Sequence, residues 1–158
     1  MAETARIALR CRPELLAGFG AAFGLALPAR PLTATATGLR AALWLGPDEW
    51  LLLAEDAPAA ALIPALEAAR AGAAAAITDI TDRQVALELE GPTAPALLAE
   101  GCPLDLDGFP VNGCARTLFG KVEVVVWRRA ADWWRLEVAR SFAPHLEAHL
   151  AEAAADLG

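Results

Sequence analysis

The chain has 158 residues, of which 56% are hydrophobic and 21% charged, and its formal net charge is −7. This composition suffices for a sizeable buried core and excludes an intrinsically disordered chain. A phosphate-binding surface needs clustered lysine and arginine, so the acidic balance argues against binding to nucleic acid and against docking on anionic membranes. No stretch of the sequence is apolar for long enough to span a bilayer.

The three cysteines, Cys11, Cys102 and Cys114, form no CxxC pair and leave an odd count. An unpaired cysteine is a liability in a secreted protein, so reduced thiols in a cytoplasm are the simpler interpretation. Arginines that precede the apolar residues 15–27 resemble a signal peptide. Because Glu14 interrupts the basic part and glycines dilute the apolar part, we expect a cytoplasmic protein.

The predicted elements begin with a strand at residues 5–11, where apolar and polar side chains alternate. Pro13 opens a helix that Gly24 closes, and residues 28–38 form a connection rich in proline and threonine. The elements that follow are a hairpin of strands 41–45 and 50–54 around a proline turn, a helix within residues 58–71 that Pro64 could kink, and a strand at residues 76–80.

The second half of the chain repeats this order. Its predicted elements are a strand at residues 85–89, a helix that Pro92 opens and Gly101 closes, a hairpin of strands 122–128 and 133–139, and a last helix that Ser141 caps and that runs to about residue 155. We therefore predict an α+β fold of two tandem ferredoxin-like β-α-β-β-α halves, residues 1–80 and 81–158, with helices packed on antiparallel sheets in one compact unit.

No combination of residues predicts a self-sufficient catalytic site or a metal site. Ser141 is the only serine in the chain, and a helix cap explains it. His145 and His149 share one helix face and could supply two metal ligands, but nothing in the sequence signals a third. We therefore assign no catalytic residue and no metal ligand to this chain.

Two further motifs have structural explanations. Gly18, Gly20 and Gly24 resemble a loosened dinucleotide-binding motif, but Pro13 has already started the helix, so these glycines do not lie at its N-terminus. Close packing and a helix C-cap explain them better. Asp79 and Asp82 are paired carboxylates beside a strand turn, and we favour turn formation over acid–base catalysis for them.

The five tryptophans, in a chain without tyrosine, point to an interaction surface. Trp133 shares a strand face with Arg135 and Glu137, and tryptophan and arginine dominate binding hot spots. The first hairpin, with Trp44 and Trp50, is apolar on both faces and must be covered on both. The candidate interface residues are thus Trp133, Trp44, Trp50 and Arg135, and the alternative is that all of them are internal core.

Several blocks between residue 42 and the last helix carry a family resemblance. They are residues 44–51 (WLGPDEWL), 78–87 (TDITDRQVAL), 101–106 (GCPLDL), 115–121 (ARTLFGK), 127–129 (WRR) and 140–142 (RSF). In this order they resemble the gamma subunits of heterotetrameric sarcosine oxidases.

The resemblance implies a place in an enzyme that demethylates sarcosine oxidatively to glycine, with formaldehyde or methylene-tetrahydrofolate and hydrogen peroxide as the other products. It implies that FAD, FMN, NAD and tetrahydrofolate lie on the alpha, beta and delta subunits, that this chain binds none of them, and that it is a non-catalytic accessory subunit. We leave open whether it affects activity or only stability.

A more distant resemblance joins Asp79-Ile80-Thr81, residues 85–87 (VAL) and Gly91-Pro92 to the aminomethyltransferase-like, folate-binding proteins, which have tandem ferredoxin-like halves. The chain lacks their Lys-Gly-Cys-Tyr-type motif, and Asp79 is the one folate candidate that the resemblance implies. A free-standing protein that binds folate or a one-carbon unit is therefore an alternative function. A small-molecule-sensing regulatory domain is a third.

Overall fold

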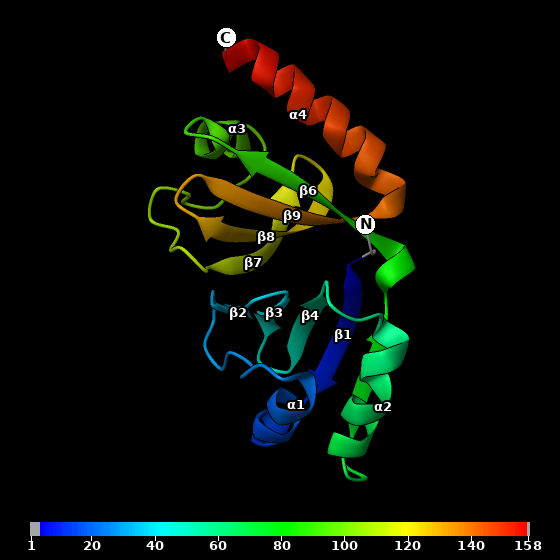
Figure 1. Ribbon diagram of the computed structural model, residues 1–158. Helices are drawn as coiled ribbons and strands as arrows, with labels where there is room; N and C mark the ends of the chain where they lie inside the picture. Colours follow the sequence, from blue (N-terminus) through cyan, green and yellow to red (C-terminus); the bar gives the residue numbers. More distant parts are fainter. Residues whose placement is uncertain (1–3, 158) are drawn as a thin grey trace. The chain divides into compact units, whose positions relative to one another are not determined.

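The computed structural model describes residues 4–157, and the chain divides into two compact units, Met1–Thr81 and Asp82–Gly158. Each unit has one antiparallel sheet with helices, as Figure 1 shows. The mixed α+β class predicted from the sequence is confirmed. None of the helices in the described part of the chain is long and apolar enough to cross a membrane.

The first unit has the β-α-β-β-α-β order of a ferredoxin-like fold, with one strand added. Its elements are β1 (Ala5–Cys11), a 3₁₀ turn (Pro13–Leu15), α1 (Leu16–Phe23), β2 (Ala34–Thr37), β3 (Arg40–Gly46), β4 (Glu49–Ala54), α2 (Ala59–Ala69) and β5 (Ala75–Asp79). The sheet order is β2-β3-β4-β1-β5, in which β5-β1-β4-β3 is the ferredoxin-like core and β2 extends one edge.

The glycines around α1 serve helix packing. The N–H of Gly24, whose φ is 79°, donates to the carbonyl of Gly20 at 2.9 Å and ends the helix in the left-handed conformation. A Cβ on Gly20 would lie 3.1 Å from the carbonyl oxygen of Leu25, so the chain that leaves the helix approaches Gly20 closely. Both glycines lie away from the helix N-terminus, where a dinucleotide phosphate would need them.

The core of the first unit lies between α1, α2 and one face of the sheet. Phe19 and Phe23 of α1 and Leu66 of α2 pack with Trp50 and the apolar residues of β1. Trp50 is only 1% exposed, and its indole N–H donates to the carbonyl of Pro28 at 2.7 Å. A buried tryptophan with a satisfied N–H is a stable core residue.

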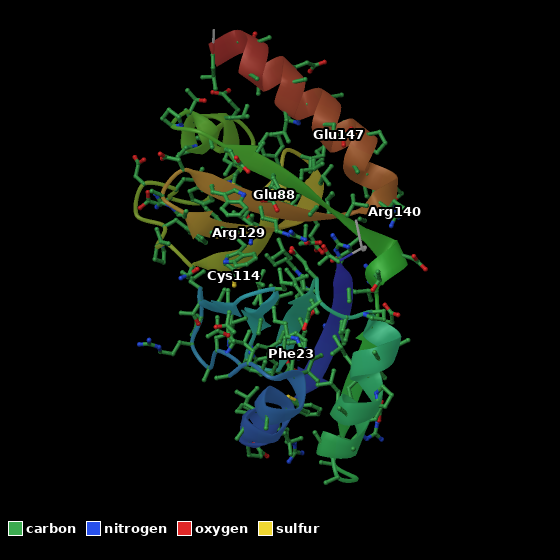
Figure 2. The ribbon with its side chains drawn as sticks, viewed as in Figure 1. Phe23, Glu88, Cys114, Arg129, Arg140 and Glu147 are labelled. Atoms are coloured by element: carbon green, nitrogen blue, oxygen red, sulfur yellow. The ribbon has the colours of Figure 1, made fainter. Side chains whose placement is uncertain are left out.

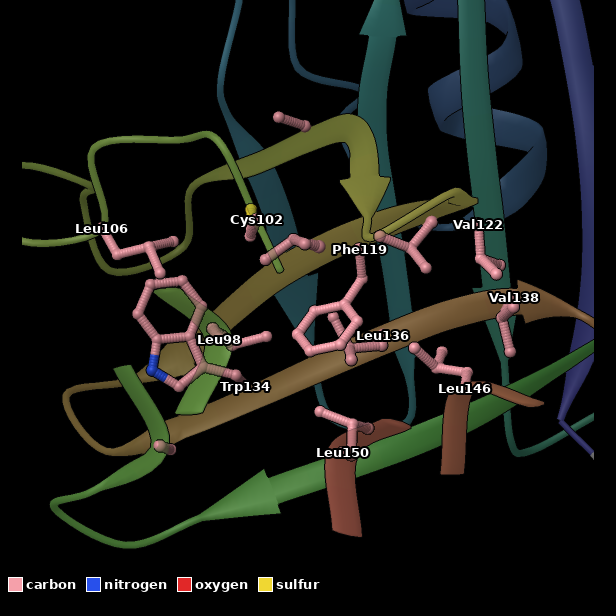
Figure 3. Close-up of a cluster of buried hydrophobic side chains, with 14 of the residues drawn as sticks. Leu98, Cys102, Leu106, Phe119, Val122, Trp134, Leu136, Val138, Leu146 and Leu150 are labelled. Atoms are coloured by element: carbon pink, nitrogen blue, oxygen red, sulfur yellow. The ribbon is translucent and has the colours of Figure 1, made fainter. Parts of the chain in front are cut away.

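The second unit follows the same order up to its last strand. Its elements are β6 (Gln84–Glu90), α3 (Ala94–Ala99), β7 (Cys114–Phe119), β8 (Val122–Ala130), β9 (Trp133–Ala139), a 3₁₀ turn (Arg140–Phe142) and α4 (Ala143–Leu157). The sheet order is β6-β9-β8-β7. Figure 3 shows the core of this unit, in which Leu146 and Leu150 of α4 point toward Phe119 and Leu136 of the sheet.

The strand register defines how the two units correspond. Leu9 lies opposite Trp50, and Leu89 lies opposite Trp134, so residue 9 is equivalent to residue 89. Both hairpins also carry a one-residue irregularity at the same point, at Leu45 in β3 and at Arg129 in β8.

Four local predictions differ from the structure. The stretch predicted as a connection contains β2, and β7 was not predicted. Ser141 lies inside the 3₁₀ turn that precedes α4 and does not occupy the cap position, because α4 begins at Ala143. The helix predicted to start at Pro13 begins with a 3₁₀ turn, and Pro64 lies inside α2 without ending it.

Candidate functional site

A group of charged and aromatic side chains lies on the face of the second sheet opposite the helix-covered core. We call it the polar cluster, and its members are Glu88 of β6, Arg129 of β8, and Trp133, Arg135 and Glu137 of β9. Figure 2 labels Glu88 and Arg129 on their strands. Because β9 lies between β6 and β8, alternate side chains of these three strands meet on one face.

Arg135 and Glu137 form a buried ion pair along β9. They are 5% and 1% exposed. The Nε of Arg135 donates to Oε1 of Glu137 at 2.8 Å, and Nη2 lies 2.8 Å from the same oxygen. Desolvation of both charges makes such a pair costly, so a hydrophobic pair of similar volume is often at least as stable. This arrangement therefore needs an explanation other than stability.

Glu88 joins the strands of the cluster. One carboxylate oxygen accepts a hydrogen bond from Nη1 of Arg135 at 3.0 Å and a longer one from Nη1 of Arg129 at 3.5 Å. The other oxygen accepts the indole N–H of Trp133 at 2.7 Å. Since two of the donors come from β9 and one comes from β8, this carboxylate fixes the positions of β8 and β9 side chains relative to β6.

Arg129 lies over two indole rings. Its guanidinium carbon is 3.9 Å from the ring centre of Trp133 and 4.9 Å from that of Trp127. Cation–π contacts of this kind contribute about 0.5–2 kcal/mol, depending on exposure. The register of β8 and β9 shifts at Arg129, and the side chain of this extra residue lies beside Trp133.

The first unit carries apolar residues at the positions equivalent to the cluster. Leu51 and Leu53 of β4 correspond to Arg135 and Glu137 of β9, and Ala8 of β1 corresponds to Glu88. The same backbone therefore folds with leucines at these positions. Because the equivalent strands of the first unit fold without these charges, the polar cluster is the best candidate for a functional site in the described chain, and Glu88, Arg129 and Trp133 are its accessible members.

The structure brings two of the four predicted interface residues together. Trp133 is half-buried and Arg135 is buried, and both belong to the polar cluster. Trp44 is half-buried and packs against the core of the first unit, opposite Trp50 on the neighbouring strand. Trp50 itself lies inside that core, so its side chain offers no surface for a partner.

The polar cluster also contains residues that sequence reasoning did not single out. Glu88 and Arg129 come from β6 and β8, and no motif joins them along the chain to the β9 residues that the sequence did place on one face. The available signal was the alternation in β6, which places Glu88 and Glu90 on the face opposite Leu87 and Leu89.

The other predicted candidates have local structural roles. The exposed Asp79 accepts the N–H of Thr81 at 3.0 Å, and the Thr81 hydroxyl accepts the N–H of Arg6 at 3.0 Å, so Asp79 organises the turn after β5. The ring of His149 packs edge-on against Phe119 with 4.9 Å between centroids. Among residues 4–157, no three His, Cys, Asp or Glu side chains gather in an arrangement that could hold a metal ion.

Comparison with known proteins identifies the family. The sequence pattern of the sarcosine oxidase, gamma subunit family matches residues 10–156. The chain belongs to the sarcosine oxidase gamma subunit family. It is 36% identical over 151 residues to sarcosine oxidase subunit gamma of Corynebacterium sp. (strain U-96), a match that covers 92% of this chain and 72% of the relative. The gamma subunit of an Arthrobacter species is 36% identical over 122 residues, which is 75% of this chain and 59% of that relative.

Solved structures agree with this family. The heterotetrameric sarcosine oxidase of Corynebacterium sp. U-96, solved in complex with pyrrole 2-carboxylate, contains a chain that matches 99% of this gamma-family chain with a TM-score of 0.91 and 34% identity, over 82% of that chain. Aminomethyltransferase T of the glycine cleavage system from Bartonella henselae matches 94% of this chain and 43% of its own, with a TM-score of 0.71 and 18% identity. The second match shows a shared fold, and the predicted likeness to aminomethyltransferase domains is confirmed at that level.

Proposed function

We propose that this chain is the accessory gamma subunit of a heterotetrameric sarcosine oxidase, an enzyme that converts sarcosine oxidatively to glycine. The observation that carries the proposal is the match to the U-96 enzyme, in which nearly all of this chain superimposes at a TM-score of 0.91. In this proposal the alpha, beta and delta subunits are the partners, and they hold FAD, FMN, NAD and tetrahydrofolate. The chain itself binds none of these cofactors and acts in the cytoplasm.

The polar cluster supports a role in assembly. Its accessible members, Glu88, Arg129 and Trp133, fit a surface that recognises a partner by complementary charge and an aromatic anchor. We assign Trp133 as the main interface residue, and Arg135, which is only 5% exposed, as the residue that holds Glu88 beside it. Trp44 is a weaker candidate because much of its side chain already packs within its own unit.

Affinity purification of the tagged chain from its native cell tests the proposal. We expect larger chains to co-purify, the eluate to absorb as a flavoprotein, and hydrogen peroxide to form when sarcosine is added. A colourless eluate that contains this chain alone would contradict the proposal. Co-expression with the candidate subunits, followed by size-exclusion chromatography, repeats the test with defined components.

Replacement of Trp133 by glutamate tests the interface. The change removes the indole beneath Arg129 and places a negative charge beside Glu88, so we expect loss of co-purification at unchanged expression. Leu118→Glu is the matched control, because Leu118 is an exposed apolar residue of β7, at the other edge of the same sheet. If the Trp133 variant assembles as well as the control, Trp133 is not an anchor.

A folate-binding protein is the second candidate, and the fold shared with an aminomethyltransferase supports it. Asp79 is the residue proposed to lie near the ligand. Binding to the native state alone raises thermal stability, so tetrahydrofolate at millimolar concentration should raise the melting temperature of wild type and not that of Asp79→Ala. An unchanged melting temperature for wild type would exclude this function.

A further inference from the structure

The two units differ at one edge of their sheets. In the first unit, β1 pairs with β4 on one side and with β5 on the other. In the second unit, the equivalent strand β6 pairs with β9 and forms the edge of the sheet. The described part of the second unit therefore has no strand at the position that β5 occupies in the first.

The backbone groups of β6 point alternately toward β9 and toward the open edge. The N–H of Gly91 donates to the carbonyl of Asp132 at 2.9 Å, and this bond shows which alternate residues of β6 bond to β9. Residues 85, 87 and 89 therefore bond to β9, whereas Ala86, Glu88 and Glu90 present their N–H and C=O groups outward. In the first unit the equivalent position of Ala86 is Arg6, whose carbonyl accepts the N–H of Ile80 after β5 at 2.9 Å.

The apolar face of β6 is incompletely covered. Val85, Leu87 and Leu89 are only partly buried, although they pack on the core of their unit. The equivalent residues of β1, which are Ala5, Ile7 and Leu9, are at most 1% exposed. Side chains of a neighbouring strand would cover the residues of β6, as those of β5 lie beside β1.

The opposite face of the same edge carries two carboxylates, of which Glu88 is already paired with Arg129 and Arg135. Glu88 and Glu90 project there, and Glu90 is exposed. A strand added beside β6 would place every second side chain on this face, and next to the exposed Glu90 a lysine or arginine is favoured by about 0.2–1 kcal/mol. Two β6 edges from two copies of this chain would instead place the exposed Glu90 of each copy at the edge without a basic partner from the other copy, and charged edges of this kind disfavour pairing between copies.

We propose that an extended segment of another sarcosine oxidase subunit, with apolar and basic residues in alternation, pairs antiparallel with β6 and completes the second sheet. This inference rests on the proposed function, because it takes the partner from the same complex. The apolar side chains of the segment lie beside Val85, Leu87 and Leu89, and its basic side chains lie beside Glu88 and Glu90. Its backbone bonds to the outward groups of Ala86, Glu88 and Glu90, in the mode of β-augmentation.

Hydrogen exchange at single-residue resolution, measured on the full chain alone and in the purified complex, tests the pairing. In the isolated chain, the amides of Ala86 and Glu88 should exchange roughly 100-fold faster than those of Leu87 and Leu89, which bond to β9. In the complex, the amides of Ala86 and Glu88 should slow by at least about tenfold. A complex in which these amides exchange as fast as in the isolated chain would contradict the pairing and leave the accessory function intact.

Proline substitutions provide a second readout in the co-expressed complex. Ala86→Pro removes one outward N–H of an edge strand, and Leu118→Pro removes the outward N–H of a residue on the opposite edge. We expect Ala86→Pro to reduce the yield of complex at least about tenfold and Leu118→Pro to leave it unchanged, with equal far-ultraviolet circular dichroism of the free chains. Equal yields for both variants would overturn the proposal.

Two other outcomes are distinguishable. Slow exchange at Ala86 and Glu88 in the isolated chain, together with a dimer in analytical ultracentrifugation, would show that a second copy occupies the edge. Absence of any co-purifying subunit would contradict the proposed function itself, and with it the assignment of the segment to a partner subunit.

Discussion

Arg135 and Glu137 occupy positions at which the first unit carries Leu51 and Leu53. We expect Glu137→Leu alone to lower the free energy of unfolding by about 3–5 kcal/mol, because it removes a buried carboxylate that balances the buried charge of Arg135. The double variant Arg135→Leu/Glu137→Leu should regain wild-type stability or exceed it by about 1–4 kcal/mol. Urea unfolding, monitored by tryptophan fluorescence, measures both values.

The control for this pair is an exposed ion pair on the same face. Arg116 and Glu123 lie 3.7 Å apart, with the glutamate side chain 70% exposed, so Glu123→Leu should change stability by less than about 1 kcal/mol. The double variant also separates stability from recognition. If it is stable but no longer assembles, the charges serve the interface, whereas normal assembly would show that recognition does not use them.

The pKa of the Cys11 thiol predicts how the stability of the fold depends on pH. Burial raises the pKa of its thiol to about 11 from the ordinary 9.0, and the nearby carboxylates of Asp48 and Glu14 add to this effect. The unfolded chain therefore releases this proton at a lower pH than the folded chain does. The Cys11 contribution to stability is complete below pH 9 and falls as the pH rises from about 9 to about 11.

Cys11→Ala should weaken this loss of stability at alkaline pH, which thermal unfolding between pH 8 and pH 11 measures. Alkylation gives an independent readout. At pH 8 the folded chain should react with iodoacetamide at Cys11 far more slowly than the chain in urea, because the thiolate is the nucleophile and the thiol is buried. Fast labelling of the folded chain would show that the thiol is accessible and its pKa is not raised.

At the scale of elements, the end of α1 depends on a glycine with φ of 79°. Gly72, after α2, has the same φ, and a Cβ there would meet nothing within 4 Å. Gly72→Ala should therefore cost only the backbone strain, about 1–2 kcal/mol. Gly24→Ala should cost more, because its Cβ would lie 3.0 Å from Nη1 of Arg40, which donates to the carbonyl of Phe23. Thermal unfolding of both variants measures which one loses more stability. Equal losses would show that the Arg40 side chain moves away from the new Cβ without cost.

Strands and helices with clear periodicity were predictable from the sequence. The alternation in β1 and β6 and the apolar hairpins gave the fold class and the element order, since burial on one face dictates such patterns. β2 escaped prediction because its four residues, Ala34–Thr37, lie at a partly exposed edge, and so short a run of small alanine and threonine side chains is only weakly apolar. Ser141 was misplaced because a 3₁₀ turn, rather than a side-chain cap, leads into α4.

The candidate site was predictable only in part. The face shared by Trp133 and Arg135 follows from strand periodicity, and the structure confirms that they lie together. The bonds from Glu88 join residues more than 40 positions apart, and no local pattern encodes them. Trp50 and Trp133 both lie in strands, and the exposure of each depends on which face of its sheet the helices cover. The sequence does not show that face, so the burial of Trp50 and the partial exposure of Trp133 could not be predicted.

At the scale of the whole molecule, the net charge of −7 predicts that the rate of association with the other subunits depends on salt. Opposite charge accelerates encounter, and salt screens it, so the association rate with the other subunits should fall by at least about tenfold between 20 mM and 500 mM salt. The dissociation rate should change much less, because buried apolar contacts govern it. Surface plasmon resonance measures both rates. An association rate independent of salt would show that the acidic charge does not steer assembly.

The open edge of β6 affects how much of this protein the cell retains. A chain synthesised in excess of its partners would carry an unpaired strand edge, which chaperones and proteases recognise as incomplete folding. The exposed Glu90 disfavours self-association of such orphan chains but does not replace the missing strand. We therefore expect the level of this chain to follow that of the other subunits, with the excess degraded, so that the stoichiometry of the complex is partly set after translation.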